Sequence, residues 1–123
     1  MEKEFAKMAS MLLSSQIQTH IFHLQTESYA EHKALQTYYE GIIDLIDGIA
    51  EAYQGKHGII TNYEAPAKFE NYGDKNIVNY FKGLAMYTEK AYDKLPDDSY
   101  LQNLYDGVIE FIYSTVYKLE NLK

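Results

Sequence analysis

Four side chains in the first half of the chain are candidates for binding a divalent metal ion. His20 and His32 stand twelve residues apart, and Asp47 and Glu51 follow fifteen and then four residues later. Imidazole nitrogens and carboxylate oxygens are common ligands of iron, manganese and zinc. The chain contains no Cys, so any metal must bind to histidines and carboxylates rather than to thiolates. We expect iron at such a site, with zinc or manganese as alternatives.

These four residues cannot bind one ion within a single chain if residues 29–53 form one helix. His32 and Asp47 would then lie about 22 Å apart along the helix axis, at about 1.5 Å per residue. A bond from the metal to an imidazole nitrogen or a carboxylate oxygen is only about 2 Å long. A shared site therefore requires a second, antiparallel copy of the helix, so that the histidines of one chain meet the carboxylates of the other.

The periodicity of the apolar residues predicts four helices and no strands. The expected segments are a helix over Glu2–Gln25, a helix that begins at Tyr29 and stops at Gly55, a loop over Gln54–Gly73, a helix from Asp74 to Leu95, and a helix that opens at Pro96–Ser99 and runs to about Leu122. Ser28 and Glu31 match the Ser-x-x-Glu capping box of a helix start. The long loop is expected to cross from one end of the bundle to the other. The predicted fold is all-α, a four-helix bundle of ferritin-like connectivity with a long crossover between helices two and three.

The composition limits the classes of protein to which the chain can belong. Its 123 residues fit a single domain over residues 1–123. No apolar run approaches the roughly 18 residues of a membrane span, and no export signal opens the chain, so we expect a cytoplasmic protein without a membrane partner. The net charge of −7, with no Arg among the basic residues, argues against strong DNA binding.

The common catalytic motifs of helical metal enzymes and of hydrolases are absent from the sequence. A di-iron site within one bundle usually uses two Glu-x-x-His pairs, and none occurs here. No phosphate-binding loop, zinc-protease motif or Ser-His-Asp order is present either. An intrachain di-iron centre and classical hydrolase chemistry are therefore not expected.

The spacing of the metal-ligand candidates resembles that of the Dps family, mini-ferritins that oxidise and store iron in twelve-subunit shells. The resemblance rests on His20, on His32 twelve residues later, and on the segment Asp47-Gly48-Ile49-Ala50-Glu51. It implies that the histidines of one subunit face the two carboxylates of a two-fold-related subunit, with Glu51 as a bridging ligand. It also implies ferroxidase activity, in which peroxide or oxygen oxidises Fe(II), and a homo-oligomer, with a dodecamer favoured and a dimer as the fallback.

The sequence also departs from the pattern of that family. Gln36 stands four residues after the second histidine, where an acidic residue is usual, and Ile21 and Ala52 replace the usual Trp and Arg. An uncharged amide binds iron weakly, so a second iron position at Gln36 is in question. His23 is an additional ligand candidate because it lies three residues from His20 on the same side of a helix.

Two other functions stay open on the sequence alone. The chain contains thirteen Tyr and no Trp. A ferritin-like shell or helical binding module that has lost ferroxidase activity could bind a small molecule or a partner protein through Tyr-rich clefts. In the second alternative the protein is a plain helical interaction protein, in which the histidines are incidental.

Overall fold

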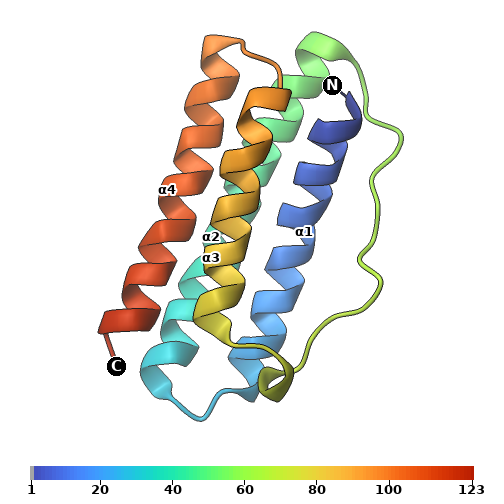
Figure 1. Ribbon diagram of the computed structural model, residues 1–123. Helices are drawn as coiled ribbons and strands as arrows, with labels where there is room; N and C mark the ends of the chain where they lie inside the picture. Colours follow the sequence, from blue (N-terminus) through green and yellow to red (C-terminus); the bar gives the residue numbers. More distant parts are fainter. Residues whose placement is uncertain (1) are drawn as a thin grey trace.

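The computed structural model describes residues 2–123, which form a bundle of four long helices (Figure 1). The elements are α1 (Glu2–Gln25), α2 (Tyr29–His57), the 3-10 turn η1 (Tyr72–Asp74), α3 (Ile77–Ala91), the 3-10 turn η2 (Tyr92–Lys94) and α4 (Ser99–Asn121). None of the described residues lies in a strand, so the prediction of an all-helical bundle is confirmed. Within this range no helix is both long enough and apolar enough to cross a membrane.

The start of α2 was predicted correctly, but its end was not. Ser28 caps the helix, and its hydroxyl accepts a hydrogen bond from the backbone N–H of Glu31 at 3.2 Å. Only this half of the predicted capping box is formed, because the N–H of Ser28 donates to the hydroxyl of Thr26. The helix does not stop at Gly55; it continues to His57 and ends at Gly58, whose φ is +100°. Glycine enters this left-handed region without a steric penalty, and at Gly58 the chain turns away from the axis.

The start of α3 also differs from the prediction. Asp74 does not cap this helix, because it lies in η1 and its carboxylate accepts a hydrogen bond from the N–H of Asn71 at 3.3 Å. The cap is Asn76, whose side chain accepts from the N–H of Asn79 at 2.9 Å. At its other end α3 stops at Ala91, and the separate 3-10 turn η2 follows it. The predicted single helix to Leu95 is therefore not formed.

Side-chain pairs across the helix interfaces show how the helices run. In each pair of helices below, the residue numbers of one helix rise while those of their contacts in the other helix fall, which shows that the two helices are antiparallel. Such pairs are Phe5 with Tyr53 and His20 with Tyr39 between α1 and α2, Tyr38 with Phe111 and Lys56 with Asp98 between α2 and the start of α4, and Lys82 with Glu120 and Glu89 with Tyr113 between α3 and α4. Because α4 is antiparallel to both α2 and α3, those two helices run in the same direction (Figure 1).

The connection between α2 and α3 lies along α1. Residues 58–71 run beside that helix from one end of the bundle to the other (Figure 1). The hydroxyl of Ser10 accepts a hydrogen bond from the N–H of Glu64 at 2.9 Å. The amide of Gln18 makes two bonds with the backbone of Glu70, at 2.7 and 2.9 Å. The segment forms no helix or strand that would pair its backbone N–H and C=O groups, so these bonds to α1 pair some of them instead. They also fix the path of the segment along α1.

Tyr38, in the first half of α2, is one of the largest side chains of the core. This side chain is fully buried, and its hydroxyl hydrogen-bonds to the hydroxyl of Ser15 at 2.6 Å. Its ring packs edge-on against Phe81 and is stacked with Phe111. Gly41 lets α4 approach, because a Cβ at this position would lie 2.6 Å from the ring of Phe111.

Replacing Gly41 with Ala should destabilise the bundle by about 1–3 kcal/mol, because the ring of Phe111 must move out of a packed interface. Gly48→Ala is the matched control in the same helix, since a Cβ there meets nothing within 4 Å. Alanine should stabilise α2 at that position by about 0.5–1 kcal/mol. Urea unfolding of both variants checks this, and equal shifts in the two variants would contradict the close approach of α4 to α2.

Candidate functional site

A pair of stacked histidines joins α1 to α2 at the end of the bundle where these helices connect. The imidazole rings of His23 and His32 lie 3.6 Å apart between centroids, with 19° between their planes. Nδ1 of His23 lies 2.8 Å from the carbonyl oxygen of His32, and Nδ1 of His32 lies 2.9 Å from that of His23. A carbonyl oxygen can only accept, so both Nδ1 atoms carry hydrogen. In the neutral rings Nε2 is therefore the nitrogen that remains free to bind a metal ion.

His20 and Tyr39 extend this pair toward solvent. The exposed ring of His20 is stacked on that of Tyr39 at 4.1 Å, and both rings meet His23 edge-on, at 5.7 and 5.1 Å. The structure thus brings together three of the predicted ligand candidates, His20, His23 and His32. Sequence reasoning missed Tyr39, although it lies seven residues after His32 and so on the same face of α2.

The carboxylates of Asp47 and Glu51 lie well away from the histidines of the same chain. The helix is unbroken from Tyr29 to His57, as the argument from helix length assumed. Both carboxylates are exposed on α2, about 22 Å or more along its axis from His32. Among residues 2–123, no three His, Asp or Glu side chains are placed to hold one metal ion. A site that combines His32 with these carboxylates therefore requires a second chain.

Gln36 lies between the histidines and the carboxylates and is already hydrogen-bonded. Its side-chain amide donates to a carboxylate oxygen of Glu40, one turn further along α2, at 2.6 Å. This hydrogen bond keeps the negatively charged carboxylate of Glu40 beside Gln36, although Gln36 itself is uncharged. A metal ion that approached Gln36 would meet the carboxylate of Glu40 beside it.

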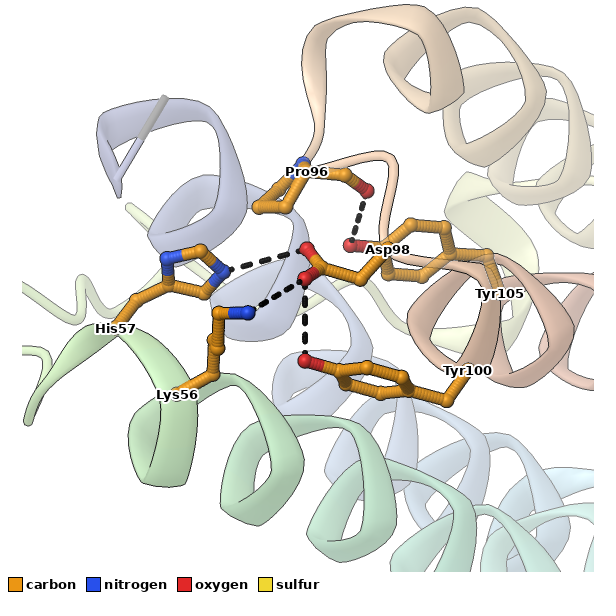
Figure 2. A network of polar contacts seen from close by, with 6 residues as sticks. All are labelled: Lys56, His57, Pro96, Asp98, Tyr100 and Tyr105. Atoms are coloured by element: carbon orange, nitrogen blue, oxygen red, sulfur yellow. Dashed lines mark hydrogen bonds and ion pairs between the residues drawn. The ribbon is translucent and has the colours of Figure 1, made fainter.

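The fourth histidine, His57, belongs to a different cluster. Figure 2 shows the carboxylate of Asp98, at the start of α4, facing the end of α2. It lies 3.5 Å from Nζ of Lys56 and 3.4 Å from Nε2 of His57, and it accepts a hydrogen bond from the hydroxyl of Tyr100 at 3.1 Å. Burial alone would raise the pKa of Asp98, but hydrogen bonds from the backbone and from these three side chains outweigh it and hold the pKa below its usual range.

Replacing His23 with Ala should cost the bundle about 2 kcal/mol, because the change removes a buried ring and leaves the carbonyl of His32 without its donor. His20→Ala, at an exposed position of the same helix, should change the free energy of unfolding by less than about 0.5 kcal/mol. Thermal unfolding of the two variants checks this difference. A larger loss for His20→Ala would contradict the assigned positions of the two rings.

Replacing Asp98 with Asn should lower stability at neutral pH only. A carboxyl whose pKa is depressed by folding stabilises the folded state above its unfolded pKa, and this contribution is lost as the pH falls through the lower folded pKa. Urea midpoints should therefore differ at about pH 7 and converge below about pH 3. Asp97→Asn, at the exposed neighbouring position, is the control and should show a smaller difference at neutral pH. If the urea midpoints of Asp98→Asn and of the unaltered protein differ by the same amount at every pH, the depressed pKa of Asp98 is wrong.

Comparison with known proteins identifies a family but no activity. No curated protein and no solved structure matches the chain. The sequence model of a family of unknown function, DUF5856, matches residues 23–119. This range contains His23, His32, Asp47 and Glu51, while His20 lies just before it. Because the match spans most of the 123 residues, the chain belongs to the DUF5856 family.

Proposed function

We propose that this chain is a Dps-type iron-binding protein that oxidises Fe(II) at a site shared between two subunits and stores iron in an oligomeric shell. The observation that carries the proposal is the separation of the two halves of the site along the α1/α2 pair. His32 lies near the start of the unbroken helix α2, and His20 of α1 stacks on Tyr39, whereas Asp47 and Glu51 lie exposed toward the other end of α2. An antiparallel second copy would bring the histidines of each chain to the carboxylates of the other.

The orientation of His32 suits a metal ligand. Its Nδ1–H donates to a backbone carbonyl, which leaves the Nε2 lone pair available. Histidines that bind metals usually make such a bond with the nitrogen that faces away from the metal, because the bond fixes the ring and its tautomer. His20 would add a second imidazole, and Glu51 of the second copy would neutralise part of the charge on the metal ion. Fe(II) would give its electron to peroxide or oxygen, and the shell would retain the ferric product.

Apolar side chains around His20 support assembly through the α1/α2 face. Leu13 and Ile17 are 42% and 50% exposed on α1, at helical spacing with His20. Ile43 is 37% exposed on α2, one turn beyond Tyr39, whose ring stacks on His20. A strip of exposed aliphatic side chains is costly in water and is typical of a surface that another chain covers. A dodecamer is the assembly that the proposal favours, with a dimer as the fallback.

Substitution of the ligands should separate metal chemistry from folding. Glu51→Gln should slow Fe(II) oxidation about tenfold or more, because an amide cannot neutralise the charge on the metal. His20→Ala should weaken Fe(II) or Zn(II) binding by removing an imidazole. Gln36→Asp should speed oxidation by adding a carboxylate beside the site. Ferric absorbance after Fe(II) addition reports the rate, and calorimetry with Zn(II) reports binding.

Two control variants accompany this series. Glu110→Gln removes one exposed carboxylate from α4, and His57→Gln removes the histidine that lies beside Asp98. Both should leave metal binding unchanged. If Glu51→Gln and His20→Ala also bind and oxidise iron like the unaltered protein, the iron proposal is wrong. The alternative of a helical module that has lost ferroxidase activity, and that binds a small molecule or a protein, would then take its place.

A further inference from the structure

The four sides of the bundle are not packed equally. α2 packs closely against α1 and α4, and α3 packs closely against α4, but α1 and α3 touch each other only sparsely. Residues 58–71 lie along this looser side, where they are bonded to Ser10 and Gln18. Beneath that segment a cleft of about 500 Å³ opens between α1 and α3. This volume is within the usual range for small-molecule sites, about 300–1,000 Å³.

The wall of this α1/α3 cleft is mainly apolar and aromatic. Met11 of α1, Phe69 of the connecting segment and Leu84 of α3 line it, together with the rings of Tyr80 and Tyr87. The ring of Tyr80 is held edge-on between Phe22 and Phe81, at 5.7 and 5.2 Å. Burial raises the pKa of Tyr80, so its hydroxyl stays protonated and can donate a hydrogen bond. Such walls accept a flat, apolar or aromatic group.

Lysines gather at the rim of the cleft and just beyond it. Lys7, Lys68 and Lys75 line the cleft itself. A second hollow of about 330 Å³ adjoins it, shares Lys7 and Tyr87 with it, and is also lined by Lys3, Lys90 and Lys94. Together the two hollows hold six lysines against three glutamates, Glu4, Glu64 and Glu70. The rest of the chain has five lysines against fifteen acidic residues.

These lysines take part in none of the ion pairs found among the described residues. The ion pairs found in residues 2–123 use Lys56, His57 and Lys82, none of which lines either hollow. Lys7 instead lies over the ring of Tyr87, with Nζ 5.9 Å from the centroid. The six lysines outnumber the three glutamates of the two hollows, so they repel one another, and a bound anion relieves this repulsion. The excess of positive charge thus favours an anionic ligand where the second hollow adjoins the cleft.

We propose that the α1/α3 cleft binds a nucleotide-like organic phosphate. Its aromatic ring would lie against Tyr80 and Tyr87, and its phosphates would lie among Lys3, Lys7, Lys90 and Lys94. Aromatic side chains stack with heterocyclic bases, and lysine binds phosphate as a point charge. A long nucleic acid fits less well, because the protein outside the two hollows is strongly acidic. The site lies on a different side of α1 from the proposed iron site and does not depend on it.

Calorimetry in metal-free buffer tests the proposal with ATP, tripolyphosphate, adenosine and a single-stranded oligonucleotide as probes. ATP should bind, and it should bind more tightly than either tripolyphosphate or adenosine, because only ATP uses both the rings and the lysines. The triple variant Lys7→Gln, Lys90→Gln, Lys94→Gln should weaken ATP binding about tenfold or more. Tyr87→Leu keeps apolar area in the wall, so it should weaken ATP binding but leave tripolyphosphate binding unchanged.

A matched triple variant controls for net charge. Lys33→Gln, Lys118→Gln, Lys123→Gln removes three lysines that line neither hollow and should leave ATP binding unchanged. Glu51→Gln, in the proposed iron site, should also leave it unchanged. Four results would each overturn the proposal: no ATP binding at about 1 mM, tripolyphosphate binding as tight as that of ATP, tighter binding of the oligonucleotide than of ATP, or equal losses in the two triple variants.

Discussion

The common direction of α2 and α3 is the constraint on which the rest of the structure depends. Because α4 is antiparallel to both, the chain must travel the length of the bundle between the end of α2 and the start of α3. The connecting segment lies along α1, where Ser10 and Gln18 hold its backbone. It therefore occupies the side between α1 and α3, and the side between α1 and α2 is left without a covering segment.

α1 consequently presents three different stripes, each at a spacing of three or four residues. Phe5, Met8 and Leu12 belong to the stripe that enters the core. The stripe that starts at Lys7 and includes Met11 lines the α1/α3 cleft. The third stripe carries exposed aliphatic residues and His20, which meets α2 through Tyr39. A single helix thus separates a basic, partly covered face from an apolar face that carries His20, and the two proposed binding sites lie on these separate faces.

Local features were predicted well from the sequence. The bounds of α1 and the cap at Ser28 follow from helical periodicity and hydrogen-bonding chemistry, which act over a few residues. The errors came where neighbouring residues compete for the same role. Gly55 is as good a helix stop as Gly58 in sequence, but only Gly58 has the positive φ. Asp74 is as good a cap as Asn76, but its carboxylate is used within η1.

The candidate sites depend on contacts over longer distances, so less of them could be predicted. His20, His23 and His32 were recognised from spacing, but the exchange of hydrogen bonds between His23 and His32 requires the turn between α1 and α2. The lysines of the cleft and of the hollow that adjoins it come from α1, the segments between α2 and α3, α3 itself and η2. Their proximity could be predicted only if the path of residues 58–71 were already known.

Complementation between two defective subunits most directly tests whether two chains build one metal site. One variant would carry His20→Ala and His32→Ala, and the other would carry Asp47→Asn and Glu51→Gln. Each alone should lose metal binding, but a two-fold pair made of one copy of each variant would contain one site with both histidines and both carboxylates intact. Native mass spectrometry of the mixture should therefore show mixed assemblies that carry metal, and Fe(II) oxidation should return on mixing. Mixed assemblies without bound metal, or metal bound equally by either variant alone, would contradict the shared site.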